Sequence, residues 1–260
     1  MLDKKNDIVP DYAGTIILTE GSEDIDLILC LLKDIYNSKS KDKVLMKKQN
    51  GNDNQRIRVT VKEHVFTIIT HSGYTCDTKQ KYDQKYKATI DQIYMQIKEN
   101  GIVDAILIIV DTDDNFATRV ASVQKLINEN IACLPEEYVH GTKCDVKTIQ
   151  NSLDIKTGYF ILPNNKDEGS LEALLLEHIE QIEGTTTNVL ACVNGMLSCL
   201  ESSVKIQSCL NTKNKKDKLR LRLYLDGLMA KHKLDYKNTY QEEIDFSHES
   251  FDKLKNFLKK

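Results

Sequence analysis

The sequence lacks the short motifs that mark several common nucleotide and zinc sites. It has no GxxxxGK(S/T) phosphate-binding loop and no GxGxxG fingerprint, which argues against ATP binding by a Walker fold and NAD binding by a Rossmann fold. No two histidines are spaced HxxxH. The segment His178-Ile179-Glu180 spells HxE, but no PCxxC completes a deaminase zinc site, so we do not expect a zinc hydrolase.

Paired cysteines, a signal peptide and a membrane span are also missing. The seven cysteines form no CxxC pair, their number is odd, and several fall on apolar helical positions, as reduced core thiols do. Residues 1–7 lack the apolar core of a signal peptide, and no apolar run approaches the roughly 20 residues of a membrane span. We therefore expect a cytoplasmic protein that does not cross a membrane.

The composition suits a soluble globular protein. Of the 260 residues, 40% are hydrophobic and 29% are charged, which is typical of an ordered chain with one medium-sized core or a core with an appendage. The net charge is −3, so no global positive field attracts nucleic acid. Any binding of nucleic acid must depend on local basic patches.

Short apolar runs alternate with amphipathic stretches before residue 183. Strands are predicted over residues 15–19, 56–62, 65–69, 105–110 and 159–162. Helices are predicted from an N-cap at Ser22, over 83–100 and 116–130, and from about Ser170. Residues 37–54 are predicted to be a polar connection. This alternation predicts an α/β fold, with helices on both faces of a parallel sheet.

The composition shifts after Glu183. Residues 1–183 are expected to form the α/β core, and residues 184–260 a helical extension packed on it. Two helices are predicted in the extension, over 186–203 and 217–233. The tail is expected to dock as a final short helix through four apolar side chains, namely Phe251, Leu254, Phe257 and Leu258.

Acidic residues directly follow two of the predicted core strands. Glu20 ends the first strand and Asp24 lies in the first turn of the next helix, while Asp111 and Asp113 follow the strand over 105–110. In open α/β sheets, ligands bind outside the carboxyl ends of the strands. Two carboxylates about 4 Å apart repel by about 4 kcal/mol at an effective dielectric constant of about 20. A divalent cation is the simplest compensation.

The same acidic residues also have structural explanations. Glu23 and Asp24 favour the dipole of the helix that they begin, and an acidic segment after a strand suits an Asx-rich turn that caps the next helix. The helix dipole does not explain Glu20, which precedes the helix. Asp111 and Asp113 point the same way in extended backbone, and Mg²⁺ takes one or two carboxylates while water or phosphate fills its other positions.

Other polar residues are weaker candidates. Asp167 and Glu172 are candidate metal ligands, and Lys166 is a candidate phosphate contact. Ser170 equally suits a helix N-cap, with Glu172 near the positive end of that helix. Arg119 follows Asp113 by one or two helical turns and is either a phosphate contact or a solvated arginine.

A basic cluster lies in the helical extension, with Tyr224 nearby. It consists of Lys213, Lys215, Lys216, Lys218, Arg220 and Arg222. The cluster is either a surface that guides nucleic acid, with Lys216 and Arg220 as the candidate contacts, or simply a solvated helix face.

The segments 16–24 and 108–113 together resemble the Toprim domain, which occurs in topoisomerases, primases, nucleases of the overcoming-lysogenization-defect family and small stand-alone proteins. The segment 159–172 and the ending near 251–254 are most similar to the stand-alone Toprim-like group of uncharacterised function. The resemblance spans about residues 13–183.

The resemblance implies a Toprim-like parallel sheet whose acidic edge binds Mg²⁺ or Mn²⁺. Glu20 matches the motif glutamate, a metal ligand or general acid/base, and Asp111 and Asp113 match the DxD ligands; these three form the expected catalytic set. Asp24 and Glu172 match further acidic residues of the family. Two-metal hydrolysis of phosphodiester bonds would follow.

The function expected from this resemblance is that of a metal-dependent nuclease acting on DNA or RNA, of a defence or toxin type. The alternative is a non-catalytic module that binds nucleic acid or a partner ATPase. Hydrolysis of a small phosphorylated metabolite is a third option. The chain departs from the family in a long connection over residues 37–62 and in lacking both the topoisomerase tyrosine domain and the nuclease ATPase. Homo-oligomerisation is left open.

Overall fold

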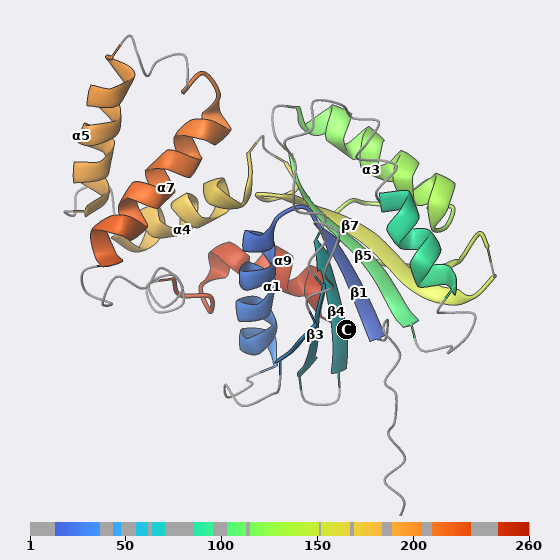
Figure 1. Ribbon diagram of the computed structural model, residues 1–260. Coiled ribbons are helices and arrows are strands. Elements are labelled where there is room, and N and C mark those ends of the chain that lie inside the picture. Colours follow the sequence, from blue (N-terminus) through green and yellow to red (C-terminus); the bar gives the residue numbers. More distant parts are fainter. Residues whose placement is uncertain are drawn as a thin grey trace, which may run out of the picture.

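The computed structural model describes most of the chain from the first strand onward. The described residues are 14–36, 44–47, 56–61, 64–70, 86–95, 103–112, 115–150, 152–166, 169–183, 189–203, 210–229 and 244–259. They form an α/β fold in which helices cover both faces of one sheet (Figure 1). The α/β class expected from the sequence is therefore confirmed.

The sheet has seven strands in the order β2-β3-β4-β1-β5-β7-β6. Their bounds are β1 Gly14–Thr19, β2 Val44–Lys47, β3 Arg56–Val61, β4 His64–Thr70, β5 Val103–Asp111, β6 Cys144–Lys147 and β7 Asp154–Leu162. The four central strands β4, β1, β5 and β7 run parallel, whereas the outer strands pair antiparallel. The predicted parallel sheet is thus the core of a mixed one.

The central strands are apolar throughout because both of their faces are covered. All six residues of β1 are buried, as are residues 105–110 of β5. By contrast, Arg56 and Arg58 of β3 are half-buried while Ile57 and Val59 are buried, which is the period of two expected for a strand near the edge. The apolar runs therefore identified the centre of the sheet.

Two strands were not predicted. Strand β2 lies within residues 37–54, which were expected to be a polar connection, and β6 lies in a region without an assignment. Each strand has four residues and pairs antiparallel with one neighbour, β3 or β7. Because so short an edge strand needs no long apolar run, the pairing partner rather than the local composition decides its formation.

Helices divide into two layers. Helices α1 (Ser22–Ile35), α4 (Leu171–Glu183) and α9 (Asp252–Leu258) cover one face, and α3 (Phe116–Asn130) and a helix over residues 86–95 cover the other (Figure 1). Alternate residues of β1 pack against the two helical layers. Ile17 packs with α1, whereas Ile16 and Leu18 pack with the helix over 86–95.

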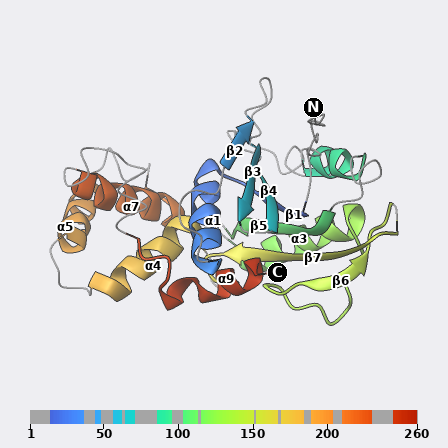
Figure 2. The same ribbon diagram turned by 90° about the horizontal axis from the view of Figure 1, so that it is seen from below.

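The extension consists of two differently placed parts. Helices α5 (Val189–Glu201) and α7 (Lys213–Met229) lie to one side of the sheet, with α4 between them and α1 (Figure 2). Helix α7 begins earlier than expected, and the Thr212 hydroxyl accepts a hydrogen bond from the Lys215 amide at 3.4 Å in its first turn. None of the helices in the described part of the chain is both long and apolar enough to span a membrane.

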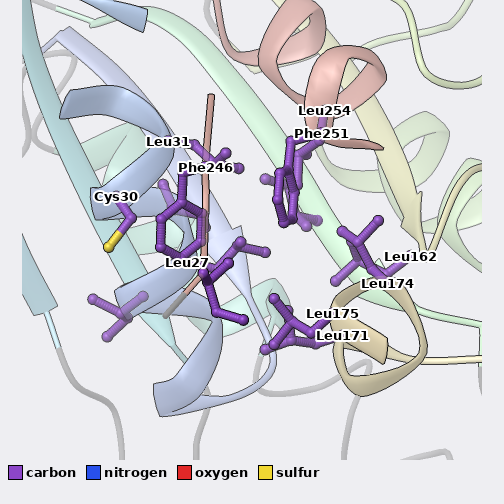
Figure 3. Close-up of a cluster of buried hydrophobic side chains, with 14 of the residues drawn as sticks. Leu27, Cys30, Leu31, Leu162, Leu171, Leu174, Leu175, Phe246, Phe251 and Leu254 are labelled. Atoms are coloured by element: carbon purple, nitrogen blue, oxygen red, sulfur yellow. The ribbon is translucent and has the colours of Figure 1, made fainter. Parts of the chain in front are cut away.

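The end of the chain returns to the sheet. A 3₁₀ turn at Glu249–Phe251 leads into α9, and the rings of Phe246 and Phe251 pack among Leu27 and Leu31 of α1 and apolar residues of α4 (Figure 3). The four side chains expected to dock the tail all lie in this core. Lys255 of α9 is also buried there and reaches Asp34 of α1 at 3.4 Å.

Candidate functional site

The order of the strands creates a switch point between β1 and β5. From β1 the chain passes through α1, on one face of the sheet, toward the β4 side, whereas from β5 it passes through α3, on the opposite face, toward β7. Neighbouring strands whose connections leave on opposite faces open a crevice at their carboxyl ends, where α/β proteins bind ligands. Glu20 directly follows β1, and Asp111 is the last residue of β5.

Glu20 and Asp111 meet at this switch point, here called the crevice, as expected from their positions at the ends of the two strands. The Asp111 amide donates a hydrogen bond of 2.9 Å to Oε2 of Glu20. The parallel register, in which Leu18 lies beside Ile108, brings the two strand ends together. The Glu20 side chain is 18% exposed, so it lies close to solvent without projecting into it.

Arg119 completes this group. Asn115 caps α3 by accepting a 2.8 Å hydrogen bond from the Thr118 amide, which places Arg119 in the first turn of α3 above the end of β5. Its Nε donates to the Asp111 carbonyl oxygen at 2.9 Å, and its Nη2 forms an ion pair with Oε1 of Glu20. The expectation of a solvated arginine was wrong, because the side chain is only 15% exposed; burial lowers the pKa of Arg119 to about 10.

The Asp111 carboxylate connects the crevice to α4. Its Oδ1 accepts a 3.0 Å hydrogen bond from the Leu171 amide, at the first residue of α4. The next residue, Thr112, donates its amide to the carbonyls of Leu162 and Gly169, each at 3.1 Å, and its hydroxyl to Leu162 at 2.6 Å. The ends of β5 and β7 and the start of α4 are thereby joined at one edge of the sheet.

Asp24 closes the first turn of α1. Its Oδ2 accepts hydrogen bonds from the Thr19 hydroxyl at 2.5 Å and the Gly21 amide at 2.8 Å, and the side chain is buried. Burial raises the pKa of Asp24, with a smaller contribution from nearby Glu172, although the two hydrogen bonds oppose the shift. The residue at the N-cap position is Gly21 and not Ser22, which is the first residue of the helix. These contacts agree with the structural explanation of Asp24.

Glu172 lies close to Asp24, outside the pair of Glu20 and Asp111. Its Oε2 accepts a 2.5 Å hydrogen bond from the Ser170 hydroxyl, and its Oε1 lies 3.8 Å from Nζ of Lys218 on α7. Burial followed by the charge of Glu172 raises the pKa of Glu23, which shows that these carboxylates share one negative region. Two other predicted acids, Asp113 and Asp167, lie outside the described residues.

The basic residues of α7 contact the neighbouring helices. Lys216 pairs with Glu201 of α5 at 2.7 Å. Arg220 pairs with Glu180 of α4 at 2.6 Å and also donates a 2.7 Å hydrogen bond to Asn194 of α5. These contacts hold three helices together, and a role in binding nucleic acid remains a prediction for both residues.

Lys166 lies in the turn after β7 and is exposed. Its backbone amide donates a 3.1 Å hydrogen bond to the Asn164 side chain. Because β7 runs parallel to β5, the turn that follows β7 lies at the same edge of the sheet as the crevice. Its predicted contact with phosphate remains a prediction.

A family comparison covers almost all of this architecture. A family model described as a protein of unknown function, DUF3226, matches residues 14–260. The chain belongs to the DUF3226 family. No curated protein matches the sequence, and no solved structure matches it either. The family match includes the α/β core and the helical extension, so both parts belong to the DUF3226 unit.

Carboxylate oxygens, such as those of Glu20 and Asp111, are ligands of hard divalent cations. Glu20 and Asp111 each have a carboxylate, which matches the one or two that a Mg²⁺ ion usually takes from protein. The contact between the two residues is made by the Asp111 backbone amide, however, and the Asp111 carboxylate accepts from the Leu171 amide. Among the residues that the structure places, no three Asp, Glu, His or Cys side chains form a metal-binding group. A Mg²⁺ or Mn²⁺ ion at this edge of the sheet therefore remains a prediction.

Two threonines of this site were not identified from the sequence. Thr19 holds Asp24, and Thr112 joins the ends of β5 and β7. Thr19 is the last residue of β1 and Thr112 directly follows β5, and both are buried. Since a buried hydroxyl requires a hydrogen-bond partner, a threonine at such a position is a signal for a polar network at that edge of the sheet.

Proposed function

We propose that this DUF3226 protein is a metal-dependent nuclease that hydrolyses phosphodiester bonds of DNA or RNA. The observation that carries the proposal is the meeting of Glu20 and Asp111 at the switch point between β1 and β5, where the Asp111 amide binds Glu20 at 2.9 Å. The Toprim resemblance of the two segments that supply these residues supports the same function.

Each residue of the crevice has a role in this proposal. Glu20 and Asp111 would hold Mg²⁺ or Mn²⁺, and Asp113 would add a ligand from the residue two positions further on. The bound cation would polarise a phosphoryl oxygen and lower the pKa of a bound water. Arg119 supplies a guanidinium beside the same carboxylates, and guanidinium groups bind phosphate oxygens in a bidentate manner.

One observation favours the alternative of a non-catalytic binding module. Both carboxylate oxygens of Glu20 already accept hydrogen bonds, one from Arg119 and one from the Asp111 amide. In a module of this kind, the ion pair would be a permanent part of the fold, and nucleic acid or a partner protein would bind without turnover.

A nuclease assay with Mn²⁺ separates the two functions. Purified protein is incubated with plasmid DNA, single-stranded DNA and tRNA, and Glu20→Gln is compared with Glu129→Gln, which removes an exposed carboxylate from α3. We expect cleavage that is lost in Glu20→Gln and kept in Glu129→Gln, with unchanged circular dichroism. Binding of these substrates without cleavage supports the module. If neither cleavage nor Mn²⁺ binding is detected, the nuclease proposal is wrong.

A further inference from the structure

We propose that Arg119 is an internal counter-ion, which occupies the cationic position at Glu20 until a divalent cation displaces it. The inference rests on the proposed function, since the competing ion is the Mg²⁺ or Mn²⁺ of that site. It adds a step in which the metal-free crevice is closed by the protein's own positive charge.

The geometry of Arg119 carries this inference. The guanidinium bridges the ends of two strands, because Nε binds the Asp111 carbonyl oxygen at 2.9 Å while Nη2 pairs with Oε1 of Glu20. The other Glu20 oxygen accepts from the Asp111 amide, which is a backbone group and cannot be withdrawn without disturbing β5. Oε1 is paired with a side chain, which can move, so a cation that arrives at Oε1 competes with Arg119.

The charges around the crevice explain why a counter-ion is needed. Glu23, Asp24 and Glu172 form a second group of carboxylates near the start of α1, and Lys218 partly offsets the charge of Glu172. The carboxylates of Glu20 and Asp111, at the ends of β1 and β5, add to this negative potential. A positive charge at Glu20 lowers the repulsion in the absence of metal.

Helix α3 is also attached to the sheet by apolar contacts. Its buried residues Val123, Leu126 and Ile127 pack in the core on that face. An ion pair removed from water gains little net stability, because the loss of hydration offsets the attraction between the charges. The position of Arg119 is therefore better explained by the electrostatics of the crevice than by the anchoring of α3.

Release of Arg119 would not leave the Glu20 carboxylate without a positive charge beside it. A cation arriving at Glu20 replaces the guanidinium charge, and the released guanidinium stays within one helical turn of the crevice on α3. Phosphate is the anion that the proposed function would place there, so cation and substrate would each take one partner of the original ion pair. The metal-free protein is expected to bind Mn²⁺ more weakly than its two carboxylates allow.

Calorimetric titration with Mn²⁺ alone tests this competition. The wild type is compared with Arg119→Gln, which removes the competing charge, and with Arg119→Lys, which keeps the charge but cannot form the bridge. Lys125→Gln is the matched control, because it also removes one positive charge from α3 at a side chain that is 73% exposed. We expect Arg119→Gln to bind Mn²⁺ about tenfold more tightly, Arg119→Lys by a smaller factor, and Lys125→Gln like the wild type.

The results that would overturn the inference differ from those that would overturn the proposed function. If the wild type binds Mn²⁺ and Arg119→Gln binds it equally or more weakly, Arg119 only positions Glu20 and the inference is wrong, while the cation site stands. If neither protein binds Mn²⁺, both proposals fail. Binding by Arg119→Gln alone supports the inference and shows that the guanidinium closes the wild-type site.

A thermal measurement covers the case in which Arg119→Gln folds poorly. The increase in melting temperature caused by Mn²⁺ is measured for the wild type and Arg119→Lys, and we expect a larger increase for the lysine variant because its hold on Glu20 is weaker. A smaller increase for Arg119→Lys than for the wild type would contradict the competition.

Discussion

The acidic edge of the sheet and the basic helix α7 are both charged clusters in the sequence, but they differ in how the fold uses them. Glu20 and Asp111 are far apart in the chain, and the parallel strands bring them into one crevice. The positive residues of α7 are close together in the chain, yet Lys216 and Arg220 contact acidic residues of different helices.

This difference shows that charge density along a sequence is a poor guide to a site. Residues on one helix spread around its axis, so a basic stretch distributes its charges over several neighbours. The ends of parallel strands meet at one edge, so acidic residues placed there are concentrated by the topology. Four predictions test whether the two regions differ in this way.

The largest expected effect on stability is at the acidic edge. In the absence of metal, Glu20→Ala leaves the largely buried Arg119 without its carboxylate, and we expect a loss of about 2–3 kcal/mol in the free energy of unfolding. Urea denaturation followed by circular dichroism measures it. The control is Glu129→Ala, which removes an exposed carboxylate from α3. It should change stability by less than about 0.5 kcal/mol. Equal effects of the two substitutions would contradict the prediction.

The next effect concerns Arg220 of α7, which has two strong contacts. Arg220→Ala removes the ion pair with Glu180 and the hydrogen bond to Asn194, and we expect a loss of about 1–2 kcal/mol. Arg222→Ala serves as the control, because Arg222 is 76% exposed and its ion pair is with Asp226, one turn away on the same helix. It should have an effect of less than about 0.5 kcal/mol. Similar losses in both variants would mean that Arg220 does not join the three helices.

A pH dependence is expected at Asp24. Its pKa is raised in the folded protein, so its contribution to stability is largest below the pKa of the unfolded chain and falls as the pH rises through the folded pKa. Asp24→Asn keeps an oxygen for Thr19 and Gly21 but carries no charge. The variant should gain stability relative to the wild type between pH 4 and pH 7. A loss of Mn²⁺ binding in Asp24→Asn would instead identify Asp24 as a ligand.

The smallest expected effect is on the binding of nucleic acid. Lys166 is exposed at the edge that holds the crevice, whereas Lys216 is engaged with Glu201. We expect Lys166→Gln to weaken binding of a single-stranded oligonucleotide and to reduce the slope of log affinity against log salt by about 1, while Lys216→Gln leaves both nearly unchanged. Fluorescence anisotropy over a range of salt concentrations measures both quantities. A larger effect at Lys216 would favour α7 as the binding surface.

The parts of the fold that were predictable are those with strong local patterns. The apolar runs of β1 and β5 and the periodicity of α3 are strong because these elements are buried on two faces or along one stripe. Strands β2 and β6 were missed, because each is four residues long and pairs on one side only. Their formation depends on a neighbouring strand, which a local pattern does not contain.

The sequence by itself determined that a carboxylate lies at the end of the first strand and at the end of β5, because an acidic residue directly follows each of the two apolar runs. The tertiary structure alone decided that Arg119 lies between them. Arg119 lies 99 residues after Glu20 in the chain, and their ion pair depends on where α3 packs against the sheet. Strand order and helix packing arise from contacts among distant residues, so the charge that balances the crevice becomes evident only in the folded chain.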